Sequence, residues 1–105
     1  MPFSIFPVEP GVTRVSLEGD LDAFTTELLR PELDGVVRRR PIHVEVDLSR
    51  LRWVDNRAME VLVAFFASLA RDDCRITVLG LKAQPLRSFK AALIDAIQST
   101  ARFIN

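Results

Sequence analysis

The chain has 105 residues, of which 49% are apolar and 27% are charged, so it has the size and composition of one globular domain. Its 14 acidic and 14 basic side chains cancel, which removes the general electrostatic argument for binding nucleic acid or an anionic membrane surface. A single cysteine, Cys74, excludes an internal disulfide and a cysteine metal cluster.

Neither the N-terminal segment nor the most apolar segment of the chain indicates export or membrane insertion. The first ten residues lack the charged segment and the long apolar segment of a signal peptide. The most apolar stretch, residues 58–70, is too short to span a bilayer, which needs about 20 residues. We therefore expect a cytoplasmic protein with no membrane insertion.

Two short strands are expected at the start of the chain. They cover residues 3–8 and 12–17, and Pro10-Gly11 between them is a turn signal that predicts a hairpin. Gly19 is expected to end the second strand.

A helix is expected next, over residues 22–37, with Asp22 as its N-cap. The apolar residues that recur at helical spacing are Phe24, Leu28, Leu33 and Val36. Pro31 cannot donate a helical hydrogen bond, so we expect a kink or a break near Arg30. The arginines at 38–40 suit a helix C-terminus and a solvated turn better than a phosphate site.

The clearest strand covers residues 42–48. One face carries the apolar residues Ile42, Val44, Val46 and Leu48. His43, the sole histidine, lies on the polar face with no nucleophile spaced beside it, so a surface or cross-strand role is favoured over catalysis.

The helix expected over residues 56–70 is apolar on more than one side. A first stripe contains Ala58, Leu62, Phe65 and Leu69, and a second contains Met59, Val63, Phe66 and Ala70. The second stripe is covered by the last helix of the chain, by a second copy in a homodimer, or by a partner protein.

The last part of the chain is expected to hold a strand and a helix. The strand covers residues 74–79 and stops at Gly80, and Pro85 suits the first turn of the helix. The core face of that helix is expected to carry Leu86, Phe89, Leu93 and either Ala92 or Ala96. Residues 98–105 form a last helical turn, a short edge strand or a C-terminal tail. The order is β-β-α-β-α-β-α without a linker, which predicts a single α/β domain over residues 1–105 with parallel neighbours after the hairpin.

Most enzyme templates are missing. One histidine cannot supply a Ser-His-acid set, no glycine-rich phosphate loop is present, and no cluster has metal-ligand spacing. Asp20, Asp22 and Asp55 all follow strands, so a small-ligand, cation or acid–base site at one rim is an alternative. Helix capping by Asp22 and Asp55 is the favoured interpretation. We expect no enzyme activity, no cofactor, no metal and no nucleic-acid partner.

Three segments resemble the STAS domain family. The run LEGDLD at 17–22, with Thr25 or Thr26 after it, resembles the entry to the first helix of that family. IHVEVDLSRLRWVDN at 42–56 is similar to its central strand, loop and phosphorylation-site turn. Residues 78–81 and 85–93 resemble its last strand and helix. The resemblance implies a mixed four-to-five-stranded sheet with helices mainly on one face. It also implies a bacterial regulatory module that binds a protein such as a kinase-type anti-sigma factor.

The chain departs from the family pattern at the phosphorylation-site turn. The family has Asp-Ser-Ser/Thr-Gly followed by an apolar residue, and this chain has Asp55-Asn56-Arg57-Ala58-Met59. The phosphoacceptor position therefore falls on Asn56, which has no hydroxyl. We expect the serine switch to be absent while asparagine still satisfies a backbone donor at the helix start.

The leading hypothesis is a non-catalytic binding module that resembles anti-sigma factor antagonists. Its predicted contact surface contains Asp22, Asp55, Asn56 and Arg57, with Met59, Glu60 and Val63 as exposed residues of the following helix. Arg57 either pairs with a local carboxylate (Asp22, Asp55 or Glu60) or contacts the partner. An accessory subunit of a transporter or of a signalling scaffold is the alternative. A displaced phosphorylation site at Thr25, Thr26 or Ser49 stays open.

Overall fold

The computed structural model describes residues 2–93 and 101–104, and its centre is one five-stranded sheet. The strands lie side by side in chain order from β1 to β5, with the bounds Phe3–Glu9, Val12–Leu21, His43–Val54, Arg75–Leu79 and Ala101–Ile104. β1 is antiparallel to β2, and each later pair is parallel. The predicted hairpin and mixed sheet are therefore confirmed. Of the alternatives for the C-terminus, the structure shows an edge strand.

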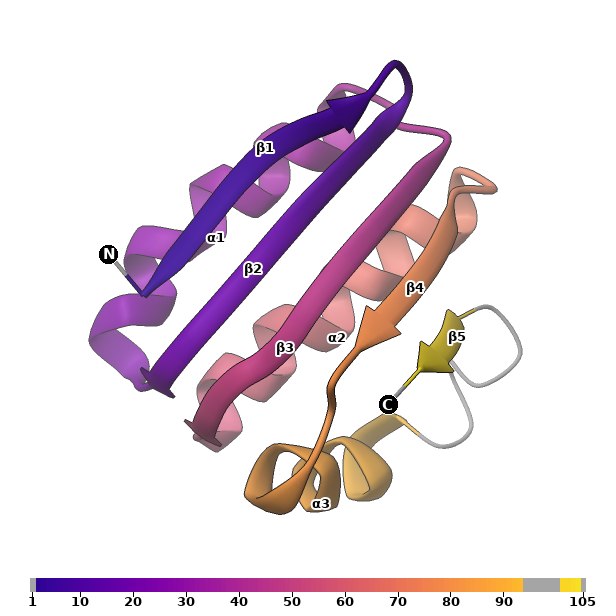
Figure 1. The fold of residues 1–105 in the computed structure, drawn as a ribbon. Helices are drawn as coiled ribbons and strands as arrows, with labels where there is room; N and C mark the ends of the chain where they lie inside the picture. The colour runs from indigo at the N-terminus through magenta and orange to yellow at the C-terminus, as the bar shows by residue number, and fades with distance from the viewer. Residues whose placement is uncertain (1, 94–100, 105) are drawn as a thin grey trace.

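Three helices connect the strands, and their bounds are Ala23–Arg38 for α1, Asn56–Arg71 for α2 and Ala83–Leu93 for α3. α1 and α2 lie side by side over one face of the sheet, while α3 lies beyond the end of β3 (Figure 1). The prediction of helices mainly on one face is confirmed. No helix among residues 2–93 is both long enough and apolar enough to cross a membrane.

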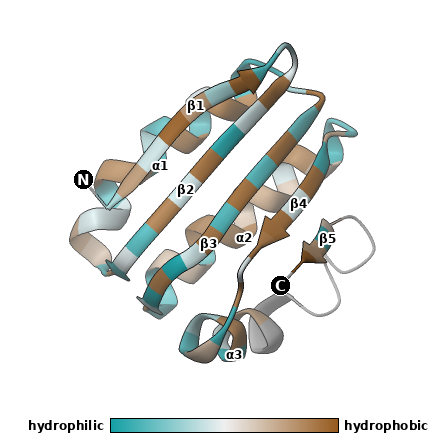
Figure 2. Cartoon of the chain, in the orientation of Figure 1, coloured by the Kyte–Doolittle hydropathy of each residue, from teal (hydrophilic) through white to brown (hydrophobic). Residues whose placement is uncertain are grey.

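The core lies between the sheet and this helical layer. Val15, Val46 and Val78 are register partners on β2, β3 and β4, and all three are completely buried against the helices. Hydrophobic and polar residues alternate along the first half of β3 in Figure 2, as a strand with one buried face requires.

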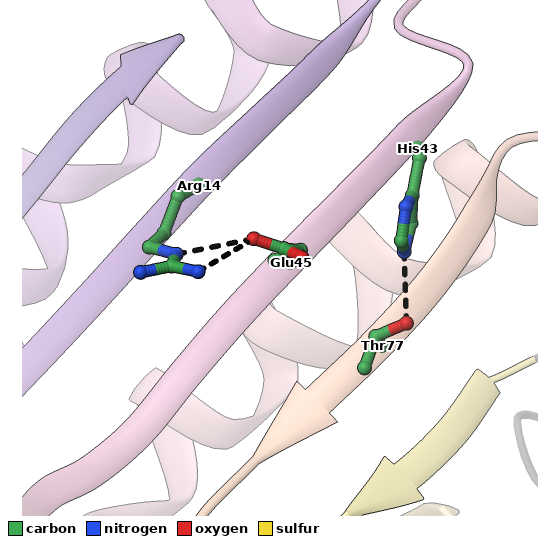
Figure 3. A network of polar contacts seen from close by, with 4 residues as sticks. All are labelled: Arg14, His43, Glu45 and Thr77. Carbon is green, nitrogen blue, oxygen red and sulfur yellow. Dashed lines mark hydrogen bonds and ion pairs between the residues drawn. The ribbon is translucent and has the colours of Figure 1, made fainter. Parts of the chain in front are cut away.

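The open face of the sheet carries polar cross-strand pairs. The Arg14 guanidinium donates two hydrogen bonds to one Glu45 oxygen, at 2.8 and 3.1 Å, and His43 Nε2 lies 2.8 Å from Thr77 Oγ1 (Figure 3). The cross-strand role predicted for His43 is therefore confirmed. Ile42 lies before β3 and is 65% exposed, so its predicted place on the buried face is wrong.

β2 and β3 are both longer than predicted. β2 continues through Gly19, whose φ of 73° is a conformation that glycine adopts readily, and the register with β3 shifts on either side of it. Along β3 the buried residues change from alternate positions to every third position, at Leu48, Leu51 and Val54. A prediction based on strict alternation therefore ends the strand at Leu48, whereas in the structure the strand continues to Val54.

α1 differs from its prediction in two ways. It is continuous through Pro31, so the expected break near Arg30 is wrong; Pro31 is exposed, and water can bind the carbonyl that loses its helical partner. Phe24 and Leu28 are 74% and 44% exposed, so they do not belong to the core face. The buried residues of α1 are Thr26, Leu29, Leu33 and Val36.

α2 begins at the predicted residue and is buried on several sides. Residues of both predicted stripes are buried, and the ring centroid of Phe66 lies 6.0 Å from that of Phe89 on α3. The last helix of the chain therefore covers the second stripe at Phe66. Phe89 is buried as predicted and Leu86 is half-buried, whereas the predicted core side chains Ala92, Leu93 and Ala96 lie outside what the structure describes.

Candidate functional site

The turn between β3 and α2 lies at the rim where the parallel strands β2 and β3 end. Leu21 and Val54 are register partners there, and the Asp55 amide donates a hydrogen bond to the Leu21 carbonyl at 3.0 Å. α1 and α2 both begin at this rim, because each helix follows one of these two strands directly. The N-terminal regions of both helices are therefore held next to each other by the sheet.

Both helices begin with an aspartate cap, as predicted. Asp55 Oδ1 accepts a hydrogen bond from the Ala58 amide at 2.8 Å. Asp22 forms a reciprocal box with Thr25, in which each side chain accepts a hydrogen bond from the backbone amide of the other. The hydrogen bonds donated by the Thr25 amide and hydroxyl hold the pKa of Asp22 below its usual value.

Asn56 is the first residue of α2 and is exposed. The cap is Asp55, so the prediction that Asn56 satisfies a backbone donor at the helix start is wrong. Within residues 2–93, the Asn56 side chain makes no hydrogen bond to the protein. Its amide is therefore free to contact another molecule.

Arg57 forms a local ion pair with a residue that the sequence did not indicate. Its Nη2 lies 2.9 Å from Glu27 Oε1 on α1, so the proposed local partners Asp22, Asp55 and Glu60 are wrong. Both side chains are more than half exposed, and pairs of this kind contribute at most about 1 kcal/mol. The ion pair joins the first turn of α2 to α1 while leaving the guanidinium in contact with solvent.

A shallow depression of about 820 Å³ lies between α2 and α3, next to Asn56. Glu60 on its border is exposed and Val63 is half-buried, as a contact surface requires. Met59 is only 5% exposed, so the prediction that it is an exposed contact residue is wrong. The depression is lined by Asn56, Met59, Glu60, Val63, Ala64, Gln84, Arg87 and Ser88.

The three aspartates of the alternative ligand site do not act together. Asp20 pairs with Arg52 at 3.2 Å, while Asp22 and Asp55 cap different helices. Among residues 2–93 and 101–104, no group of three or more His, Cys, Asp or Glu side chains could hold a metal ion. The geometry thus favours capping over a cation or acid–base site at this rim.

The three hydroxyls considered as displaced phosphorylation sites differ in access. Thr26 is completely buried, and its hydroxyl donates to the Asp22 carbonyl at 2.6 Å. The Thr25 hydroxyl belongs to the capping box. Ser49 is exposed and its hydroxyl donates to Asp47 at 2.7 Å. Ser49 is therefore the most accessible of the three.

Two residues at this rim were not singled out from the sequence. Gln84 on α3 forms hydrogen bonds with both backbone groups of Val54, the residue before the turn. Trp53, the only tryptophan, is 51% exposed beside it. An exposed tryptophan one residue from a polar turn was a signal available in the sequence, whereas nothing local indicated the contact of Gln84.

A protein-family comparison agrees with this arrangement. A family model described as "Mlab, STAS domain" matches residues 6–99. The chain belongs to the STAS domain family. This STAS domain is 25% identical over 85 residues to an anti-sigma-B factor antagonist of Listeria monocytogenes, across 80% of the chain and 75% of the relative. The same protein of Listeria innocua matches equally well.

Solved structures share the fold. The phosphorylated form of the Bacillus cell fate determinant SpoIIAA has a TM-score of 0.76 and 14% identity, over 98% of this chain and 91% of that one. An anti-sigma factor antagonist from Mycobacterium paratuberculosis gives 0.79 and 20%, over 97% and 83%. A sulfate transporter family protein from Wolinella succinogenes gives 0.74 and 19%, over 94% and 80%. The predicted α/β STAS fold is confirmed, and function must be argued from the site.

Proposed function

We propose that this STAS domain is a non-catalytic bacterial module that binds a protein partner through the turn at Asp55, Asn56 and Arg57. The observation that carries the proposal is the exposed Asn56 side chain on a turn whose backbone is fixed by the Asp55 cap. The similarity to anti-sigma-B factor antagonists supports a partner of the anti-sigma factor type.

The turn combines a rigid backbone with a varied surface. The Asp55 cap and the bond to Leu21 hold the backbone, so little conformational entropy is lost there on binding. Asn56 offers an amide, Arg57 a cation and Glu60 an anion, and Asn56 and Glu60 also line the depression between α2 and α3. Such a surface suits a partner that presents an apolar side chain flanked by polar groups.

The proposed module has no phosphorylation switch at the turn. A phosphoryl group on residue 56 would add about −1.5 to −2 charges at the start of α2. Asparagine offers no hydroxyl for that chemistry, so the affinity for the partner would not be controlled at this position. The module would bind constitutively, and regulation would act on the amount of protein or on the partner.

A transporter accessory subunit is the second candidate. The fold shared with a sulfate transporter family protein from Wolinella succinogenes favours it, since both chains align over most of their lengths. The same turn would then contact a transporter subunit. Identification of the bound partner separates the two candidates, because one predicts a kinase-type regulator and the other predicts a transporter ATPase.

Capture from cells with three tagged forms tests the proposal. Asn56→Gln keeps a neutral amide, whereas Asn56→Asp adds a charge at the position of the missing phosphoacceptor. An aspartate in the first turn favours the helix by about 0.3–1 kcal/mol, so lost binding by Asn56→Asp would not reflect unfolding. We expect wild type and Asn56→Gln to capture the same cytoplasmic protein and Asn56→Asp to lose it. Equal capture by all three forms would refute the proposed surface.

Mass spectrometry of the protein purified from cells tests the absence of the switch. We expect no phosphate on residues 49–60. Stoichiometric phosphorylation of Ser49, which is exposed, would show that the switch has moved along the chain rather than disappeared.

A further inference from the structure

The end of β3 has a strand neighbour on one side only. β3 and β4 pair from His43 with Arg75 to Asp47 with Leu79, but β3 continues to Val54. The last residues of β3 therefore extend past β4, and their backbone groups on that side need other partners. This stretch leads directly into the turn at Asp55.

The side chain of Gln84 takes the place of the missing strand at Val54. Its Oε1 accepts a hydrogen bond from the Val54 amide at 2.9 Å, and its Nε2 donates one to the Val54 carbonyl at 2.9 Å. In a parallel sheet, a neighbouring strand would form hydrogen bonds with the amide and the carbonyl of such a residue in the same way. The Val54 amide can only donate and its carbonyl can only accept, so these two bonds fix the orientation of the Gln84 amide. Nε2 also donates to Ser88 Oγ on the same helix at 2.8 Å.

Residues before and after Gln84 hold this part of α3 in place. Ala83, directly before it, has a φ of 57°, a left-handed conformation that is uncommon for alanine. Further along the helix, Phe89 is buried against Phe66 of α2. The turn before Gln84 and the packing after it therefore set where its amide points.

We propose that Gln84 is a positioning residue for the partner-binding turn, through which α3 fixes the end of β3 and the Asp55 cap that follows it. The inference rests on the proposed function of the turn, although the positioning itself is measurable without a partner. It makes the placement of α3 a determinant of partner affinity. Gln84 lines the depression between α2 and α3, so a partner that fills this depression contacts the residue that holds the turn.

Trp53 and the Val54 amide are natural reporters of this contact. Trp53 is the only tryptophan, is 51% exposed and precedes Val54, so its fluorescence reports on the end of β3 alone. Gln84→Met keeps the length of the side chain and removes both hydrogen bonds. Arg87→Met is the matched control, because Arg87 lines the same depression and is exposed.

We expect Gln84→Met to raise the hydrogen-exchange rate of the Val54 amide by on the order of tenfold. The variant loses both the hydrogen bond that this amide donates to Gln84 Oε1 and the one that Gln84 Nε2 donates to the Val54 carbonyl. Acrylamide quenching of Trp53 should increase in the same variant. Arg87→Met should change neither. Both readouts are taken where urea titration shows every variant to be fully folded, so a general loss of stability does not account for them.

Unchanged Val54 exchange and unchanged Trp53 quenching in Gln84→Met would overturn the proposal. Equal effects in Gln84→Met and Arg87→Met would also overturn it, because the effect would then belong to the depression as a whole. Capture of the partner by Asn56→Asp is measured independently. If that variant binds normally while Gln84→Met still loosens Val54, the proposed function fails and the positioning by Gln84 stands.

Discussion

Replacing Asp55 with alanine measures what the cap of α2 contributes to the fold. The substitution removes the acceptor of the 2.8 Å hydrogen bond from the Ala58 amide. Loss of an N-cap costs about 1 kcal/mol, and loss of a negative charge at a helix start costs about 0.3–1 kcal/mol more. The free energy of unfolding should therefore fall by about 1–2 kcal/mol in Asp55→Ala.

Asp55→Asn separates the two contributions. Asparagine caps as well as aspartate but has no charge, so this variant should lose only about 0.3–1 kcal/mol. Urea denaturation followed by circular dichroism gives both values, and an unchanged m-value shows that the unfolded state is comparable. Each kcal/mol should lower the melting temperature by roughly 4–8 °C in a domain of this size.

Two results would refute this reasoning about the cap. Asp55→Ala could match the wild type within about 0.3 kcal/mol, which would mean that the hydrogen bond to Ala58 contributes nothing. Asp55→Asn could instead be as unstable as Asp55→Ala, which would mean that charge rather than capping holds the turn.

Further predictions concern the strands and α1. Gly80→Ala should cost about 3 kcal/mol or more in urea denaturation, because its φ is 71° and an added Cβ would lie 2.6 Å from backbone of β3; stability near that of the wild type would contradict this clash. Leu29→Ala should cost about 2–5 kcal/mol and Leu28→Ala less than about 1 kcal/mol, since only the first is buried; equal costs would contradict the observed face of α1. The lowered pKa of Asp22 stabilises the fold above the usual value of 3.8 and stops doing so as pH falls through the folded value. Acid titration of Asp22→Asn should therefore show a smaller loss of stability below pH 3.8, and a curve identical to that of the wild type would contradict it.

Elements with one regular period were predictable from the sequence. Val44, Val46 and Leu48 alternate with polar residues, and the strand that they predict is present. The helix predicted from Asn56 begins at that residue, because Asp55 is a strong cap signal and the following residues are apolar on several sides. In both cases the local pattern and the tertiary burial agree.

Other features depend on contacts that a local pattern does not contain. The apolar residues of α1 fit two helical faces, and packing selects the face with Leu29 over that with Phe24 and Leu28. The register shifts between β2 and β3 change the spacing of buried residues and hide the end of β3 from a search for alternation. Only the folded chain shows which residue faces which across such distances.

In the candidate site too, features set by the local sequence were predictable and features set by tertiary contacts were not. Its position and both caps were predicted, because Asp22 and Asp55 act on their own helices. The partner of Arg57 and the contact of Gln84 with Val54 each join residues 30 positions apart, so spacing along the chain could not indicate them. Met59 was placed at the surface although it is only 5% exposed, because the spacing of apolar residues along α2 does not show which sides of the helix are covered.

The affinity of the captured partner for Asn56→Asp, compared with Asn56→Gln by titration calorimetry, tests the central claim most directly. If the partner binds at the turn, the added charge should weaken binding by tenfold or more, which corresponds to about 1.4 kcal/mol, while the neutral amide leaves it near the wild-type value. Equal affinities for the two variants, both folded, would contradict a partner surface at Asn56.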